Sequence, residues 1–162
     1  MTFEIFWQFV SFFGDRIFWI ALFLISGILY LFLDKANRKK ISWGFYYLLP
    51  SALVLTVLIE LLKFSFQIPR PCILLEGCPS DYSFPSGHTA IISTLATIAI
   101  LKLKKPKIYI PLVILAVLVG ASRIFLGYHT LADVIFGALA GIFVAIIITK
   151  TVNKFFMKPG KK

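Results

Sequence analysis

Five long apolar runs, separated by short polar segments, constrain the fold of this chain more than any other feature. The runs cover about residues 17–33, 41–62, 88–101, 108–121 and 131–149. Hydrophobic residues make up 59% of the chain and charged residues only 15%, whereas soluble domains carry about 25% charged residues. A helix needs roughly 20 apolar residues to cross the hydrocarbon core of a bilayer, and the third run, residues 88–101, is short for a span. The sequence therefore predicts one all-α integral membrane domain over residues 1–162, a compact bundle of five or six transmembrane helices.

Residues 2–16 precede the first run and carry a narrow polar stripe among many aromatic side chains. Glu4, Gln8, Ser11 and Asp15 recur at helical spacing, as on an amphipathic helix that lies in the membrane interface. The alternative is that these residues lengthen the first span. That span would then be far longer than the roughly 20 residues that a bilayer needs, so we expect an interfacial helix over residues 2–16.

Basic residues are distributed unevenly over the segments between the runs. If the spans alternate, residues 34–40, residues 102–107 and the tail from Lys150 share one side and hold 13 of the 17 Lys and Arg residues. Cytoplasmic loops are enriched in these residues, so we expect the C-terminus to be cytoplasmic. The 63–87 loop and residues 122–133 then face the extracytoplasmic side of a cell or inner membrane. Topology accounts for the net charge of +10, and nucleic acid is not an expected partner.

Four polar clusters fall on the predicted extracytoplasmic side, each at an end of an apolar run. Arginine binds phosphate oxygens with a two-pronged set of donors, and lysine adds a point charge. A helix start offers free N–H groups to an anion, and glycine lets the backbone approach it closely. The clusters therefore predict a phosphate site built from Lys63, Arg70, Ser86, Gly87, His88, Ser122, Arg123, His129 and Asp133.

His129 and Asp133 are four residues apart, which puts them on one face of a helix. A carboxylate bonded to one imidazole nitrogen leaves the other nitrogen with a lone pair. The alternative for this stretch alone is a polar helix cap at a membrane surface. Phosphoryl transfer without a metal needs a nucleophile, a proton donor and cations. The clusters contain all three, including both histidines of the chain, His88 and His129.

The order and spacing of these residues resemble the three-part signature of the type 2 phosphatidic acid phosphatase superfamily, in its membrane lipid phosphatase branch. The matching segments are Lys63-x6-Arg70-Pro71, Pro85-Ser86-Gly87-His88 and Ser122-Arg123-x5-His129-x3-Asp133. The resemblance covers about residues 60–150. It implies that His129 is a nucleophile that forms a phosphohistidine, that Asp133 orients it, and that His88 is first an acid and then a base. It also implies that no metal or other cofactor is needed and that the phosphate is held by Lys63, Arg70, Ser86, Gly87, Ser122 and Arg123.

The resemblance implies a phosphatase that removes the terminal phosphate of a membrane lipid at the extracytoplasmic face. Polyprenyl (undecaprenyl) diphosphate is the expected substrate. Phosphatidylglycerophosphate, phosphatidate and lipid A 1-phosphate are the alternatives. Two other functions stay open, namely transfer of the phosphate to a second lipid and non-catalytic lipid binding. Membrane members of the superfamily commonly have six spans, whereas five apolar runs and an interfacial helix are predicted here.

Cys72 and Cys78 are the two cysteines of the chain, and both lie in the 63–87 loop. An extracytoplasmic compartment permits a disulfide, and a metal site would need more ligands than this loop offers. We expect a disulfide that braces the loop carrying Arg70. Two free thiols are the alternative.

Overall fold

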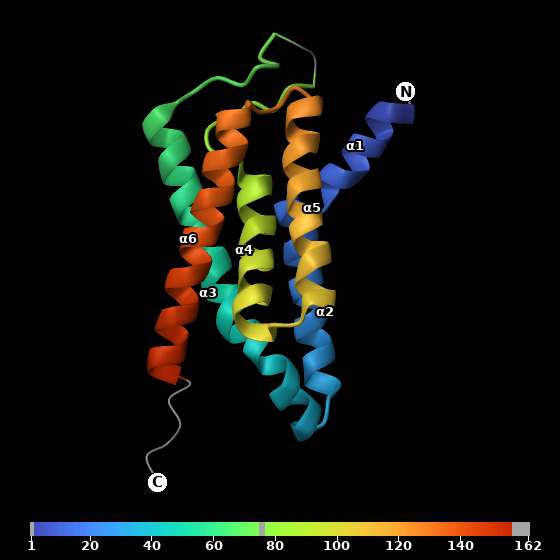
Figure 1. Ribbon diagram of the computed structural model, residues 1–162, viewed down its shortest axis with the longest axis vertical. Coiled ribbons are helices and arrows are strands. Elements are labelled where there is room, and N and C mark those ends of the chain that lie inside the picture. The colour runs from blue at the N-terminus through green and yellow to red at the C-terminus, as the bar shows by residue number, and fades with distance from the viewer. Residues whose placement is uncertain (1, 75–76, 157–162) are drawn as a thin grey trace.

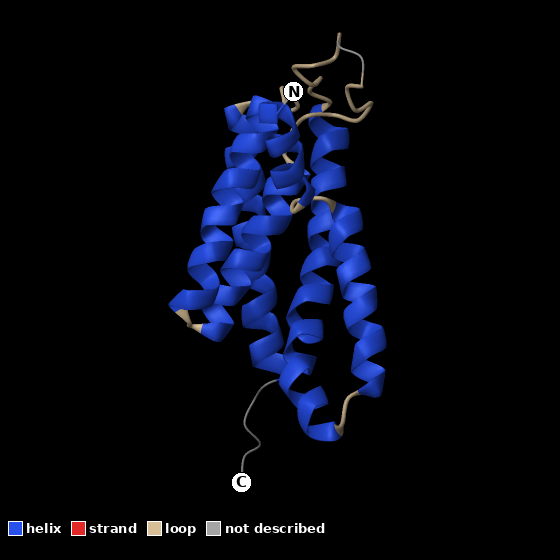
Figure 2. Ribbon diagram, turned by 90° about the vertical axis from the view of Figure 1, so that its right-hand side faces the viewer, coloured by secondary structure: helices blue, strands red, loops and turns tan. Residues whose placement is uncertain are grey.

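The computed structural model is a bundle of helices, most of which run along the long axis of the molecule (Figure 1). It describes residues 2–74 and 77–156, without the side chains of residues 2, 36–43 and 156. Within these ranges the regular structure consists of helices and contains no strand (Figure 2). The helices are α1 (Thr2–Phe12), α2 (Arg16–Phe32), α3 (Lys35–Phe66), α4 (Gly87–Leu103), α5 (Pro106–Phe125) and α6 (Leu131–Phe156).

Helix α4 lies in the middle of the bundle, and two glycines bring α6 close to it (Figure 1). A Cβ atom added to Gly137 would lie 2.4 Å from the carbonyl oxygen of Ser86, and one added to Gly141 would lie 2.2 Å from that of Ala90. Helices in lipid associate through such close backbone contacts. These contacts hold the start of α4 beside the start of α6, so they bring together the two segments that carry the histidines.

Helix α3 is longer than the predicted span of residues 41–62. It begins at Lys35, continues through Pro50 and ends at Phe66. The helix ends before Gln67, whose backbone is left-handed (φ 49°). The N–H of Gln67 donates to the carbonyl oxygen of Lys63. Lys63 therefore lies in the last turn of a rigid helix rather than in the loop.

Three helices of the described residues are long and apolar enough to cross a membrane: Gly44–Phe66 within α3, Pro106–Phe125, and Leu131–Phe155 within α6. The pair α1 and α2, bent by 47° at its break, would make a fourth. Helix α4 has only 17 residues, and its start is set back from the ends of α5 and α6 (Figure 1). The chain is an all-helical integral membrane protein, and the predicted count of five or six spans is not confirmed by helix length and composition.

Helix α1 is shorter than the predicted residues 2–16, because Gly14 and the helix cap Asp15 form a break before α2. It packs on α5, where the Trp7 ring stacks on Phe125 with centroids 4.6 Å apart. Ser11, from the predicted polar stripe, is buried in the protein. The large apolar side chains exposed along α1 are Phe3, Ile5, Phe6, Phe9 and Phe12. Their place in the membrane interface stays a prediction.

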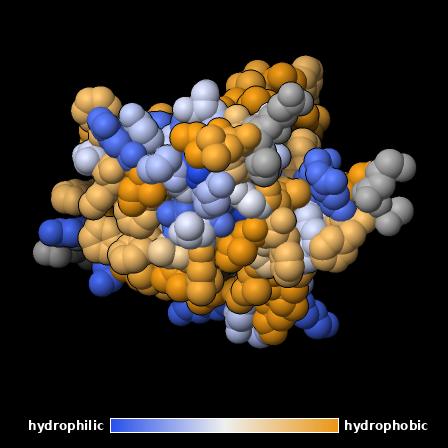
Figure 3. All heavy atoms as spheres, turned by 90° about the horizontal axis from the view of Figure 1, so that it is seen from above, coloured by the Kyte–Doolittle hydropathy of each residue, from blue (hydrophilic) through white to orange (hydrophobic). Residues whose placement is uncertain are grey.

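The polar connections of the bundle are divided between its two ends. The segments 67–86 and 126–130 lie at one end, and the α2–α3 and α4–α5 connections and the end of α6 lie at the other (Figure 1). Viewed from the first end, hydrophilic residues gather near the centre and hydrophobic residues surround them (Figure 3). The predicted site residues belong to segments at this end of the molecule.

Candidate active site

His129 lies in the loop between α5 and α6 with its side chain buried. Its Nδ1 is 3.6 Å from Oδ2 of Asp133, and its Nε2 is 3.0 Å from Nη1 of Arg70. A guanidinium group can only donate hydrogen bonds. Nε2 is therefore the acceptor in this contact, which assigns the ring proton to Nδ1, on the side of the carboxylate. The lone pair of the ring points toward the cationic side of the site.

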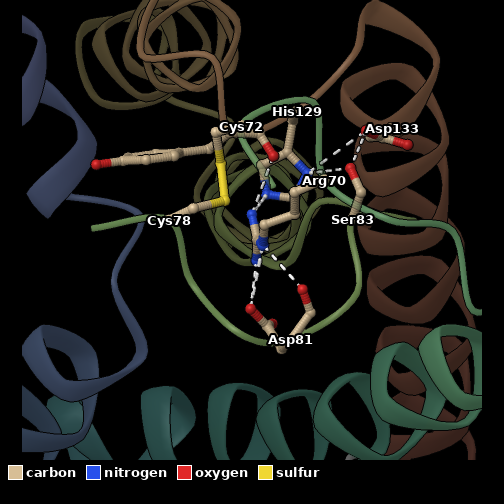
Figure 4. Close-up of a disulfide and its surroundings, with 8 residues drawn as sticks. Arg70, Cys72, Cys78, Asp81, Ser83, His129 and Asp133 are labelled. Atoms are coloured by element: carbon tan, nitrogen blue, oxygen red, sulfur yellow. Dashed lines mark hydrogen bonds and ion pairs between the residues drawn. A yellow bond between two sulfur atoms is a disulfide. The ribbon is translucent and has the colours of Figure 1, made fainter. Parts of the chain in front are cut away.

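Asp133 is held by donors that the sequence did not single out. Its Oδ2 accepts a hydrogen bond from the hydroxyl of Ser83 (Figure 4). It also accepts one from the backbone N–H of Thr130 at 2.7 Å. The N–H of Asp133 donates in turn to Oγ1 of Thr130, which makes a capping box at the start of α6. The 3.6 Å separation between Oδ2 of Asp133 and Nδ1 of His129 is longer than a hydrogen bond.

Ser83 is a site residue that the sequence analysis missed. Its side chain is fully buried, and its hydroxyl also lies 3.4 Å from Nδ1 of His129. It stands two positions before Pro85, outside the three matching segments, so proximity to the second segment was its only sequence signal.

Burial controls the charge of His129. Burial in the bundle and then the charges of Arg70 and Arg123 lower the pKa of His129 from 6.5 to about 2. Lys63 and His88 act in the same direction. The imidazole is therefore neutral at physiological pH, which is the state in which Nε2 can act as a nucleophile.

Two of the predicted phosphate-binding cations share one carboxylate, that of Asp81. Arg70 donates to Oδ1 of Asp81 from Nη2 at 2.7 Å and from Nε at 3.1 Å (Figure 4). Lys63 contacts Oδ2 of the same carboxylate. Burial raises the pKa of Asp81, but the hydrogen bonds from Lys63 and Arg70 outweigh it and lower the pKa from 3.8 to about 2. The sequence analysis missed Asp81, whose only signal was its place between the first two segments.

Arg123 is the third predicted cation, and only some of its hydrogen-bond donors have partners. Its Nη1 donates to Oγ of Ser11 at 2.7 Å, and its guanidinium group lies 4.7 Å from the centroid of the Tyr128 ring. Its Nε is buried and has no hydrogen-bond partner among the described residues. Ser122 differs from this pattern, because its hydroxyl donates to the carbonyl oxygen of Val119 within α5. The structure therefore directs the Ser122 hydroxyl to its own helix rather than to the phosphate site.

The segment Ser86–His88 forms the start of α4. The N–H of Ser86 donates to the carbonyl oxygen of Asp133 at 3.0 Å, and its hydroxyl caps the helix through Thr89. A Cβ atom on Gly87 would make only an ordinary contact, 3.7 Å from a methyl group of Ile59. Among the described residues, no neighbour would clash with a side chain at this position. The His88 side chain is 24% exposed.

Cys72 and Cys78 are joined by a disulfide, with Cα atoms 5.6 Å apart. The bond closes the loop segment that begins two residues after Arg70 (Figure 4). In the structure, a covalent bridge thus lies next to the arginine that contacts both His129 and Asp81.

The apolar helical bundle defines an integral membrane protein, and at one end of it a buried histidine lies between a carboxylate and a group of cations. The chain belongs to the PAP2 superfamily, whose family model matches residues 43–157. This match includes every predicted catalytic and phosphate-binding residue.

Two curated relatives are similar in sequence. The undecaprenyl-diphosphatase of Sulfolobus acidocaldarius is 36% identical over 146 residues, which cover 86% of this chain and 66% of that protein. The undecaprenyl-diphosphatase BcrC of Bacillus subtilis is 35% identical over 134 residues, which cover 80% of this chain and 64% of that protein. The chain thus spans just under two thirds of the length of each of these relatives.

Two crystal structures are similar in fold. LpxE of Aquifex aeolicus superposes with a TM-score of 0.71 at 34% identity, covering 92% of this chain and 86% of that one. A transmembrane PAP2-type phosphatidylglycerolphosphate phosphatase of Bacillus subtilis gives a TM-score of 0.75 at 25% identity, covering 98% of this chain and 80% of that one. Both similarities cover more than nine tenths of this chain, so they extend beyond the matched family region of residues 43–157.

Proposed function

We propose that this protein is a metal-independent lipid phosphatase that removes the terminal phosphate of a membrane lipid through a phosphohistidine at His129. The observation that carries the proposal is the pair of contacts on the His129 ring. Nδ1 faces Asp133 at 3.6 Å and Nε2 faces Arg70 at 3.0 Å. A neutral imidazole whose free lone pair faces a cation is suited to attack a phosphoryl group bound by that cation.

The reaction has two steps with a proton transfer in each. Nε2 of His129 attacks the terminal phosphorus, the bond to the bridging oxygen breaks, and His88 gives that oxygen a proton. Water then attacks the phosphohistidine, His88 takes a proton from it, and inorganic phosphate leaves as the N–P bond breaks. Lys63, Arg70 and Arg123 bind the equatorial oxygens and supply positive charge that a metal ion supplies in other phosphoryl-transfer enzymes. The unpartnered Nε of Arg123 supports its place in this set.

We propose a polyprenyl (undecaprenyl) diphosphate as the substrate. An apolar groove of about 450 Å³ runs between α4, α5 and α6 from Thr89, next to His88, toward the membrane interior. Such a groove suits the chain of a lipid whose head group lies at the start of α4. The names of the two curated relatives favour a prenyl diphosphate over phosphatidylglycerophosphate, phosphatidate and lipid A 1-phosphate. The proposed side of reaction is extracytoplasmic, because the site lies at the end of the bundle opposite the basic connections.

The test is phosphate release by the purified protein in detergent with EDTA. The substrates are undecaprenyl diphosphate and the three alternative lipids, and the control variant is His129→Ala. We expect phosphate release from undecaprenyl diphosphate to be the fastest. We expect His129→Ala to lower that rate by at least about a thousandfold. A wild-type protein that releases phosphate from none of these lipids would contradict the phosphatase. Release only after addition of an acceptor lipid would indicate a phosphotransferase.

The groove has a separate test of its own. Val117, on α5, lines the groove, whereas Ile114 on the same helix is exposed outside it. We expect Val117→Trp to raise KM for the long-chain diphosphate several-fold and to leave hydrolysis of a short-chain diphosphate unchanged. Ile114→Trp should change neither. Equal effects of the two variants, or an equal loss on both substrates, would exclude the groove as the chain site.

A further inference from the structure

The break between α1 and α2 packs against the start of α4, although it lies far from the matching segments in sequence. A Cβ atom on Gly14 would lie 2.8 Å from Cβ of His88 and 2.7 Å from Cγ1 of Val119. Glycine is therefore needed for this close approach. The hydrogen bond from Arg123 to Ser11 anchors the preceding helix to α5. Asp15, which directly follows Gly14, is thus held next to His88.

Asp15 uses its two carboxylate oxygens for two different purposes. Oδ1 accepts a hydrogen bond from the N–H of Ile17 at 2.7 Å, which caps α2. Oδ2 lies 3.7 Å from Nε2 of His88, which is an ion-pair distance. Because the cap fixes the orientation of the carboxylate, the second oxygen is directed at the ring that the proposed reaction needs as an acid.

The other charged groups around His88 are mainly cations. Arg16 from α2, Arg70 from the α3–α4 loop and Arg123 from α5 act on it electrostatically, and His88 interacts with the His129 ring. Lys63, at the end of α3, contributes positive charge to the same site. Glu60 of α3 is paired with Arg16, 2.5 Å away. Among the described residues, Asp15 is the carboxylate at ion-pair distance from His88. Its negative charge favours a proton on a ring where burial and the surrounding cations disfavour one.

We propose that Asp15 is a positioning residue that orients His88 and favours its protonated form for donation to the leaving oxygen. This inference rests on the proposed function, because it requires His88 to act as an acid. It assigns the N-terminal part of the chain, which lies outside the matched region of residues 43–157, a direct part in the site. His88, the proposed acid, then has a carboxylate partner in Asp15, as His129, the proposed nucleophile, has in Asp133.

The test is the pH profile of kcat/KM for Asp15→Asn. Asparagine also caps helices, so this change removes the charge and keeps the cap. We expect the alkaline limb of the profile to move to lower pH by about one unit, and kcat at pH 7.5 to fall about tenfold with KM changed less than twofold. Asp15→Glu should restore the wild-type limb in part. Thermal unfolding of each variant in detergent reports on folding, and Asp15→Ser, which also keeps a cap, replaces Asp15→Asn if that variant does not fold.

The matched control is Glu60→Gln, which removes a nearby negative charge that contacts Arg16 rather than His88. We expect its alkaline limb to coincide with that of the wild type. The inference is overturned if Asp15→Asn has the wild-type profile, or if both variants shift equally. A wild-type protein inactive on every lipid would overturn the proposed function itself, whereas an active protein with an unshifted Asp15→Asn overturns only the inference.

Discussion

At the scale of single residues, the carboxylate of Asp81 is bound where the proposed reaction needs a phosphate. It contacts Lys63 and Arg70 together, and its pKa of about 2 keeps it charged at all physiological pH values. A phosphate dianion that approaches these cations competes with Asp81 for them. Asp81 therefore balances the charge of the two cations when no phosphate is bound.

We expect Asp81→Asn to strengthen inhibition by inorganic phosphate or vanadate several-fold. The amide keeps the shape of the side chain but no longer competes with the anion as a charge. The measurement is the inhibition constant of each anion in the phosphate-release assay. Asp34→Asn, a change at the opposite end of the bundle, serves as the control for net charge. Weaker inhibition in Asp81→Asn would mean that Asp81 holds Lys63 and Arg70 in their binding positions instead.

The lowered pKa of His129 makes stability depend on pH. The folded protein leaves His129 neutral down to about pH 2, whereas the unfolded chain binds a proton below about 6.5. The stability contributed by this difference is complete above pH 6.5 and is lost as the pH falls below it, by about 1.4 kcal/mol between pH 7.5 and 5.5. We expect the Tm of the wild type to fall more between pH 7.5 and 5.5 than the Tm of His129→Gln does. Tryptophan fluorescence of the protein in detergent measures both values. Equal losses would contradict the buried neutral histidine.

At the scale of the elements, the site depends on how closely α4 and α6 approach. Ser86 and Asp133 are joined by a backbone hydrogen bond, and Gly137 lies directly against Ser86. The short α4 begins below the ends of its neighbours (Figure 1), so the polar start of the helix lies inside the bundle. The two glycines of α6 therefore serve to position the start of α4 beside His129.

We expect Gly137→Ala to destabilise the protein by about 1–3 kcal/mol and to lower phosphate release at least tenfold. The added methyl group would meet the carbonyl oxygen of Ser86 and push the start of α4 away from α6. Gly27→Ala is the matched control, because its Cβ would meet only a ring atom of Phe45, at 3.9 Å. Thermal unfolding and the phosphate-release assay measure the two effects. Indistinguishable behaviour of the two variants would contradict close packing at Gly137.

At the scale of the whole molecule, the charge pattern along the chain and the arrangement of the helices agree. Residues 34–40, residues 102–107 and the end of α6 carry ten of the 17 Lys and Arg residues, and they lie at the end opposite the site. In a membrane this arrangement predicts a cytoplasmic C-terminus and an extracytoplasmic site.

A C-terminal reporter tests this orientation in cells. We expect green fluorescent protein fused to the C-terminus to fluoresce and alkaline phosphatase fused there to be inactive, because only a cytoplasmic C-terminus gives this combination. A single fusion within the 77–83 segment should give the opposite pattern. Active alkaline phosphatase at the C-terminus would reverse the proposed orientation.

The sequence by itself determined the class of the fold and the residues of the proposed chemistry. Composition and the length of the apolar runs indicated an all-helical membrane protein, because lipid requires each spanning segment to satisfy its own backbone. Helix starts were predicted well where a cap or proline marks them, as at Ser86 in α4. The match of spacing and order identified the histidines and the cations, since residues at a helix end are set by positions a few residues away along the chain.

Only the tertiary structure decided which other side chains join them. Asp15, Ser83 and Asp81 each meet a partner that is distant along the chain or lies on another element. Ser122 matches the signature, yet its hydroxyl is turned into its own helix. Such contacts depend on how helices pack, and packing in turn depends on where small residues such as Gly14 and Gly137 let backbones approach. The spacing of residues along the chain does not determine those distances between helices.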